Sequence, residues 1–222
     1  MRETRLPPLP SVFTPIALRE GGDAVARAVA LAAERGAGTL AWVGAAARAE
    51  AALVLEPEQP LAEARLALLA GATALADALA PGGPADIPVQ FAWPDRLLVN
   101  GAACGALRLV APPGARPDQV PDWLVLSFTV ALAPAGPGGA EPGLTPERTT
   151  LAEEGWDGPD GAQLTAGWAR HLMAGLDDWQ ARGPERLCAT YLARLVAPAG
   201  AHGIDPLTGD LLLAEGRRPL CP

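Results

Sequence analysis

The spacing of apolar residues predicts four helices. In the segment 24–35, Val25, Val29 and Leu31 lie on one helical face, Asp23 is placed to cap the first turn, and Gly36 is a suitable C-terminal stop. The same criteria predict further helices over 60–80, 162–182 and 184–195. Helical segments therefore occur both early and late in the chain.

Short apolar runs between these helices predict strands. They cover 39–43, 52–55, 89–93, 97–99, 103–110 and 122–132. The segment 44–50 is interpreted as an Ala-rich turn, and Asn100-Gly101 is the strongest hairpin signal in the chain. The run 122–132, DWLVLSFTVAL, is long and hydrophobic enough for a central strand. A last hairpin is predicted over 203–213, with its turn at 206–210.

This order of elements predicts an α+β fold, in which a mixed or antiparallel sheet of about five to seven strands is flanked by helices. We expect residues 1–195 to form the main domain and residues 196–222 to add a short C-terminal hairpin. The Pro/Gly-rich stretch 133–143 is predicted to be a loop.

Charge and composition then narrow the function classes. The chain has 222 residues and a formal net charge of −8, and all 17 of its basic residues are arginine because it contains no lysine. An acidic chain without an arginine run argues against nucleic acid and anionic membranes as partners. The three cysteines, Cys104, Cys188 and Cys221, show no metal-ligand spacing, so no metal site is expected. The N-terminus lacks the apolar segment of a signal peptide, and no stretch approaches a charge-free membrane span, so a soluble cytoplasmic protein is expected.

One hairpin carries the clearest motif, FAWPDRLLVNGAACGALRL over 91–109. Four short motifs follow one another along the chain: 92–95 (AWPD), 102–105 (AACG), 149–155 (TTLAEEG) and 203–205 (GID). In this order and approximate spacing the chain resembles the biotin/lipoate protein ligase superfamily, in particular the catalytic domain of biotin protein ligases. The resemblance spans most of the chain and implies the same fold.

The resemblance also implies a chemistry. Ligases of this superfamily join a small carboxylic acid to ATP and pass the acyl group to a lysine of a carrier protein, using a lysine after the hairpin and a Gly/Arg-rich loop to balance the negative charges. Here Ala102 stands at that lysine position and Ala92 at a second one. The loop position offers only Gly44 and Arg48, and Arg48 is interpreted either as an anion contact or as a solvated turn residue. The sequence thus predicts a degenerate adenylation site.

Several residues of the hairpin have two possible roles, one structural and one functional. Trp93 with Pro94 forms either a core or pocket wall or a ligand platform, and Asp95 either binds a ligand N–H or caps a turn. Cys104, beside Gly105, is either a buried packing residue or a nucleophile. Octanoyltransferases of the superfamily carry their cysteine on a later segment, which here reads Ala-Pro-Ala-Gly over 133–136. The acidic pairs 153–154 and 177–178 lie in helical or capping contexts without metal-ligand spacing and are interpreted as solvated charges. Arg108 is interpreted as a solvent-facing residue on the face opposite that of Gly105.

Three functions remain open from the sequence. The leading hypothesis is a ligase-like protein that binds a small carboxylic acid or a biotinyl or lipoyl carrier domain without ligating it, and needs no cofactor. The second is an atypical ligase or acyltransferase that uses ATP with biotin or lipoate, with arginine, Asp95 or Cys104 replacing the lysine. The third is a non-catalytic scaffold. A homodimer is expected only if 122–132 proves to be an edge strand.

Overall fold

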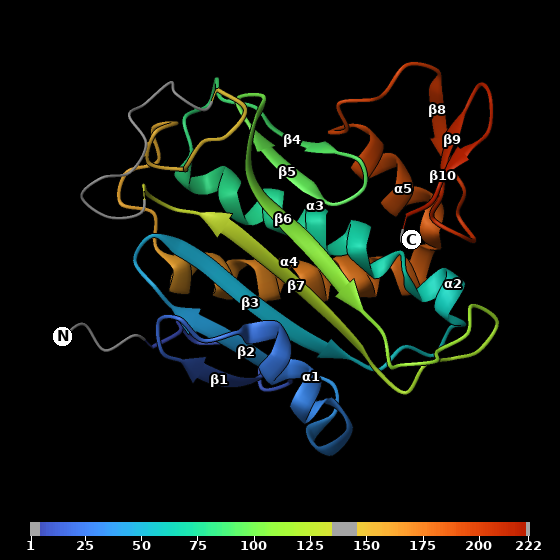
Figure 1. The fold of residues 1–222 in the computed structure, drawn as a ribbon, viewed down its shortest axis with the longest axis horizontal. Coiled ribbons are helices and arrows are strands. Elements are labelled where there is room, and N and C mark those ends of the chain that lie inside the picture. The colour runs from blue at the N-terminus through green and yellow to red at the C-terminus, as the bar shows by residue number, and fades with distance from the viewer. Residues whose placement is uncertain (1–4, 135–145, 221–222) are drawn as a thin grey trace.

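A large mixed sheet organises the protein. The computed structural model describes residues 5–134 and 146–220. Seven strands form the sheet in the order β1-β2-β3-β7-β6-β5-β4 (Figure 1). Their bounds are Thr14–Leu18 (β1), Thr39–Gly44 (β2), Arg48–Leu55 (β3), Val89–Ala92 (β4), Arg96–Val99 (β5), Ala102–Val110 (β6) and Leu124–Ala131 (β7). The predicted α+β class and mixed sheet are confirmed.

The longest apolar run forms the middle of this sheet. β7 pairs antiparallel with β3 along one side and with β6 along the other, and among these seven strands only β1 and β2 pair in parallel. The central position predicted for 122–132 is therefore correct, and the condition for a dimer through this strand is not met. At one outer edge of the sheet, β1 contains Pro15, which has no backbone N–H to donate. At the other edge, the backbone of Phe91 in β4 forms hydrogen bonds with the backbone of Arg194 and Val196.

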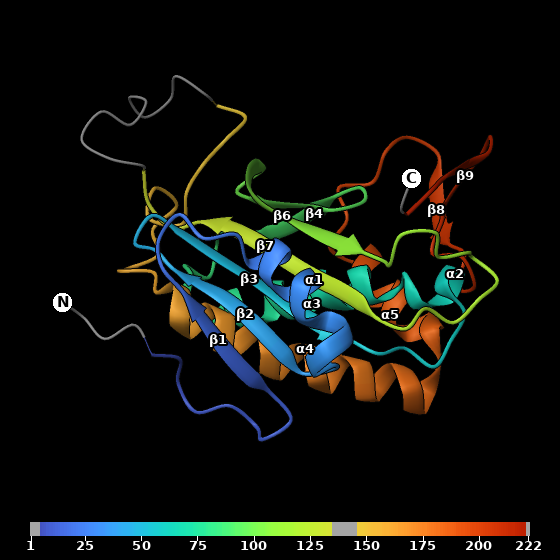
Figure 2. The same ribbon diagram turned by 60° about the horizontal axis from the view of Figure 1, so that its bottom comes forward.

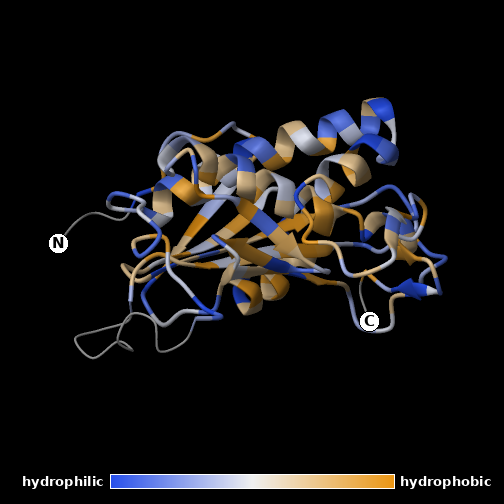
Figure 3. Cartoon of the chain, turned by 90° about the horizontal axis from the view of Figure 1, so that it is seen from above, coloured by the Kyte–Doolittle hydropathy of each residue, from blue (hydrophilic) through white to orange (hydrophobic). Residues whose placement is uncertain are grey.

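Helices cover both faces of the sheet. α3 (Ala67–Leu79), α4 (Gly161–Arg182) and α5 (Pro184–Leu192) enclose the main core on one face, and α1 (Ala24–Arg35) packs on the other (Figure 1). Figure 2 shows α4 running along the underside of the sheet. Hydrophobic residues concentrate in the strands between these layers (Figure 3). Asp23 caps α1 as predicted, because its Oδ1 accepts the Ala26 N–H at 2.8 Å.

The helix predicted over 60–80 is broken. It consists of α2 (Leu61–Ala64), α3 and a 3-10 turn η1 (Ala80–Gly82), with Arg65 and Leu66 between α2 and α3. The stretch Leu61–Gly82 is apolar and long enough to cross a membrane by length and composition, although it is not free of charged residues. However, 67% of its most apolar window is buried within the fold, as in the core helix of a soluble domain.

Two further element boundaries differ from the prediction. β3 begins at Arg48 rather than at residue 52, so Arg48 is not a turn residue. The C-terminal segment forms three antiparallel strands, β8 (Ala201–Ile204), β9 (Leu211–Leu213) and β10 (Arg217–Arg218), rather than one hairpin. Leu211 and Leu220 of this segment are buried in the same core as α3 to α5.

Candidate functional site

Trp93 and Pro94 connect β4 to β5 and hold the hairpin against the C-terminal part of the chain. The Trp93 ring meets Tyr191 edge-on, with 6.0 Å between ring centroids, and its Nε1 donates to the carbonyl of Pro219 at 3.2 Å. The Tyr191 hydroxyl donates to the Pro94 carbonyl at 2.9 Å. These contacts give Trp93 and Pro94 a packing role, and they join the Trp-Pro-Asp hairpin to the segment that follows the Gly-Ile-Asp motif.

Asp95 presents its carboxylate at the surface. Its backbone carbonyl accepts the Leu107 N–H at 2.8 Å, whereas its Oδ1 lies 4.0 Å from Nε of Arg96. The side chain of Asp95 is 42% exposed, and its charged partner within residues 5–134 and 146–220 is Arg96, so the structure does not show the turn cap considered from the sequence. Its place beside Arg96 leaves it available to a ligand donor.

Gly105 and Cys104 lie where β6 makes a bulge opposite β5. A Cβ at residue 105 would stand 2.4 Å from the Thr129 carbonyl, so close approach of β7 requires glycine there. Cys104 is buried in the core on the face covered by α3, α4 and α5, where its Sγ lies 3.5 Å from the Ala131 carbonyl. Burial, assisted by the negative charge of Glu154, raises the pKa of the Cys104 thiol to about 12. This environment fits a packing residue and not an activated nucleophile.

Ala102 is the first residue of β6. The next residue, Ala103, forms backbone hydrogen bonds with the segment 147–149. The Ala103 N–H donates to the Glu147 carbonyl at 2.9 Å, and the Thr149 N–H donates to the Ala103 carbonyl at 3.1 Å. Ala102 itself is partly exposed and offers no polar side chain at the position where the resemblance implies lysine.

On the face of the sheet that is covered by α1, polar residues lie on the strands next to that helix. Through the strand register, Val43, Glu50, Thr129, Ala106 and Arg96 lie opposite one another in a single row across five strands. Val43 packs with α1, which places the whole row on the α1 face. Thr129 is exposed although it belongs to the central strand. We call the exposed part of this row, with the neighbouring residues Arg48 and Ala131, the α1-side surface.

Glu50 is the organising residue of the α1-side surface. Its Oε1 accepts the backbone N–H of Ala24, in the first turn of α1, at 2.9 Å. Its Oε2 lies 2.9 Å from the guanidinium of Arg48, and the side chain of Glu50 is only 12% exposed. Glu50 thus neutralises Arg48 and at the same time occupies the positive end of the α1 dipole. Gly44, predicted with Arg48 as a ligand residue, ends β2 opposite Ala49.

A second set of polar contacts, which was not predicted from the sequence, lies on the 149–155 segment. Glu154 accepts from the Thr149 hydroxyl at 2.6 Å and from the Asn100 side-chain amide at 2.9 Å. Glu153 accepts from the N–H and hydroxyl of Thr150. Glu154 ties this segment to the hairpin and is therefore more than a solvated charge, whereas Glu153 is exposed and caps the turn within its own segment. The Thr-x-x-Glu spacing of a capping box at 150–153 was the available signal.

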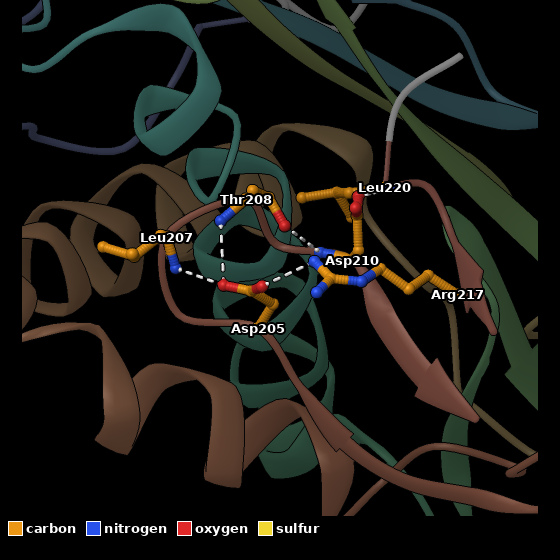
Figure 4. Close-up of polar contacts among 6 residues, drawn as sticks. All are labelled: Asp205, Leu207, Thr208, Asp210, Arg217 and Leu220. Carbon is orange, nitrogen blue, oxygen red and sulfur yellow. Dashed lines mark hydrogen bonds and ion pairs between the residues drawn. The ribbon is translucent and has the colours of Figure 1, made fainter. Parts of the chain in front are cut away.

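Asp205 of the Gly-Ile-Asp motif organises the C-terminal strands. Its Oδ1 accepts from the N–H of Leu207 at 2.9 Å and of Thr208 at 3.3 Å, and its Oδ2 pairs with Arg217 of β10 at 2.9 Å (Figure 4). These contacts lower the pKa of Asp205, chiefly through the hydrogen bond from Leu207. The motif therefore has a structural role here. No group of three metal-ligating side chains occurs among the residues described.

Comparison with known proteins assigns the chain to a family. The model of the biotin/lipoate A/B protein ligase family matches residues 6–193. The chain belongs to this family. A biotin protein ligase-like protein of unknown function from Silicibacter sp. TM1040 shares 29% sequence identity and a TM-score of 0.84, with 96% of each chain covered. The search of curated proteins found no match.

Solved biotin protein ligases share the fold of this family member. The Aquifex aeolicus enzyme, as a point mutant in complex with biotin, has a TM-score of 0.68 at 14% identity, with 94% of this chain and 95% of that chain covered. The Leishmania major enzyme in complex with biotinyl-5-AMP has a TM-score of 0.59 at 14% identity, with 96% of this chain and 100% of that chain covered. The fold that the resemblance implied is therefore confirmed.

Proposed function

We propose that this member of the biotin/lipoate ligase family binds a biotinyl or lipoyl group while that group is attached to its carrier protein, and does not adenylate the free acid. The observation that carries the proposal is the position of Glu50, which is bound to both Arg48 and the N-terminus of α1. An internal carboxylate occupies the two positive features that would otherwise receive an external anion.

Charge balance is the reason for excluding adenylation. Acyl-adenylate formation brings a carboxylate and the phosphates of ATP together, and this requires fixed positive charge. The chain contains no lysine, and the family resemblance aligns Ala102 and Ala92 with lysine positions. Arg48 does not replace them, because its charge is already balanced by Glu50.

The same reasoning distinguishes the two ligand classes left open by the sequence. A free acid would bring a second carboxylate close to Glu50, whereas a biotinyl or lipoyl group linked to lysine is a neutral amide. Small side chains flank Thr129 on the α1-side surface, with Ala106 opposite it on β6 and Ala131 two residues along β7. A neutral acyl chain has space there, and the Thr129 hydroxyl can hydrogen-bond to an amide.

Matched titrations test this proposal. Biotin, lipoate and octanoate are compared by calorimetry with their N-alkyl amides and with a biotinylated carrier domain, each with and without ATP and magnesium. We expect the amides and the modified carrier to bind without ATP, the free acids to bind more weakly, and no pyrophosphate to be released. Release of pyrophosphate with any acid would overturn the proposal, and so would tighter binding of the acids than of their amides.

An arginine-dependent ligase is the second candidate, because two other arginines lie on the same face. Arg96 is opposite Ala106, and Arg108 is two residues further along β6, so the two are diagonal neighbours about 7–8 Å apart. Such a pair could contact an anionic group. This candidate predicts pyrophosphate release in the natural protein that is lost in both Arg96→Gln and Arg108→Gln.

A further inference from the structure

We propose a second ligand site, on the opposite face of the sheet from Glu50, for a small apolar molecule with a neutral or cationic polar end. The site is a cavity of about 210 Å³ between the C-terminal half of α4 and the end of β3. Neither the family resemblance nor the proposed carrier binding uses it, so it stands independently of the function proposed above.

The inner wall of this cavity is apolar and formed by buried side chains. Leu53 of β3, Leu124 of β7 and Ala67 of α3 line it, and each side chain is at most 3% exposed. On the helix side the wall is formed by Leu172, which is fully buried, and Trp179, which is 7% exposed. Because none of these side chains can donate a hydrogen bond except the Trp179 ring, the interior favours hydrocarbon over water.

Polar groups occur at the rim and carry one sign of charge. Glu56 and Glu58 lie in the exposed segment after β3, and Gln59 and Gln180 add two amides. None of the lining residues, all of which lie in the described part of the chain, is basic. The rim therefore repels a carboxylate and favours an ammonium, while the amides suit a hydroxyl or amide end group.

The volume limits the size of the occupant. A water molecule has a share of about 30 Å³ in the liquid, and an apolar cavity of about 150 Å³ accommodates benzene. A cavity of about 210 Å³ is therefore suited to an unbranched chain of about seven carbon atoms or to a single ring with a short arm. Met173, which is 39% exposed at the rim, can pack over such a chain because its side chain is flexible.

The site is separated from the α1-side surface by the sheet itself. Leu53 points into the core shared with α3 and α4, whereas Glu50, three residues earlier on the same strand, points toward α1. A molecule in the cavity cannot touch Glu50 or Thr129. Binding at the two sites can therefore be changed by separate substitutions.

Three probes of equal length test the proposal: heptylamine, heptan-1-ol and heptanoate, titrated calorimetrically into the full chain. We expect saturable 1:1 binding of heptylamine and heptan-1-ol, and binding of heptanoate weaker than that of heptylamine by about tenfold or more. Double substitution of Glu56→Gln with Glu58→Gln should remove the preference for the amine. The control pair Glu20→Gln with Glu34→Gln, two exposed carboxylates on other segments, should leave it unchanged.

A cavity-filling variant locates the binding. Leu176→Trp, on the α4 side of the cavity, should abolish binding of heptylamine and heptan-1-ol. Leu192→Trp, which changes a partly buried leucine of α5 outside the cavity, should not. Melting curves of both variants verify that they are folded. Absence of saturable binding by all three probes in the natural protein would overturn the proposal, and so would amine binding that persists in folded Leu176→Trp. Because Glu50→Gln should not alter heptylamine binding, failure here is distinguishable from failure of the proposed carrier function.

Discussion

Arg48 and Glu50 lie on the same side of β3, and their side chains form an ion pair of 2.9 Å next to the first turn of α1. Arg48 is 45% exposed and Glu50 is nearly buried, so the carboxylate is the fixed partner of the pair. Under the proposed function, this pair leaves Arg48 without an unbalanced positive charge for an external anion. It also identifies Glu50 as the residue to change first.

Glu50→Gln should convert the α1-side surface toward acid binding. The glutamine oxygen can still accept the Ala24 N–H, but Arg48 loses its counter-charge. We expect the affinity for free biotin or octanoate to rise about five- to tenfold, equivalent to about 1–1.4 kcal/mol, while that for the corresponding amides changes less than about twofold. The free energy of unfolding should fall by at most about 1 kcal/mol, since the pair is partly exposed.

The control for this prediction is Glu34→Gln, which removes an exposed charge from the far end of α1. It should alter neither affinity. An equal rise for acids and amides in Glu50→Gln would contradict the charge argument, because it would show that shape rather than charge limits binding.

Local sequence signals predicted those parts of the fold that depend on local chemistry. Asp23 caps α1, Asn100-Gly101 forms its turn with φ of 53° and 82°, and the apolar run around 124–131 lies at the centre of the sheet. β10 could not be predicted in the same way. It consists of two exposed arginines that pair with β9, and Asp205 binds one of them, Arg217, so no apolar alternation marks this strand.

The contacts of Glu50 with Arg48 and with the first turn of α1 could also not be predicted from the sequence. Placing the start of β3 at residue 52 left Arg48 in a turn, whereas the strand begins at Arg48. The role of Glu50 depends on its register opposite Val43 and on the position of α1 over β2, which are tertiary relationships. For Cys104 and Trp93, by contrast, the packing interpretation considered from the sequence agrees with their contacts.

Cys104 should be unreactive in the folded protein. With a pKa of about 12, about one thiol in 10,000 is ionised at pH 8, and the group is also buried. Cys188 is buried as well, and burial raises its pKa to about 11. In a Cys221→Ser background, an aromatic disulfide reagent at pH 8 should label neither residue until urea unfolds the chain. Labelling of Cys104 in the native state at the rate of free cysteine would contradict this environment and reopen a nucleophilic role.

Asp205 should stabilise the C-terminal strands in a pH-dependent way. Its pKa is lower in the folded protein than in the unfolded chain, so its contribution is complete above the ordinary aspartate pKa of about 4 and is lost as the pH falls through the folded value. We expect Asp205→Asn to lower the free energy of unfolding by about 0.5–1.5 kcal/mol at pH 7, with the difference shrinking below about pH 4.

Urea denaturation across that pH range measures the effect of Asp205→Asn, and amide hydrogen exchange at Leu207 and Thr208 localises it. The exposed residue Asp86 provides the control, since Asp86→Asn should show no comparable change. A destabilisation that is constant from pH 7 to pH 3 would show that shape, and not the charge of Asp205, holds the turn.

A pair of glycine-to-alanine substitutions tests the close approach of β6 and β7. A Cβ at residue 105 would meet the Thr129 carbonyl at 2.4 Å and the Val130 side chain at 3.1 Å, so either strand pairing or the bulge has to shift. Gly105→Ala should therefore cost about 1–3 kcal/mol of unfolding free energy. Gly175, in the interior of α4, has nothing within 4 Å of an added Cβ, and Gly175→Ala should stabilise the protein by about 0.5–1 kcal/mol. Both are measured by urea denaturation. A neutral Gly105→Ala would mean that the hairpin can move away from β7, and that residues 102–105 are not held rigidly enough to form a defined ligand surface.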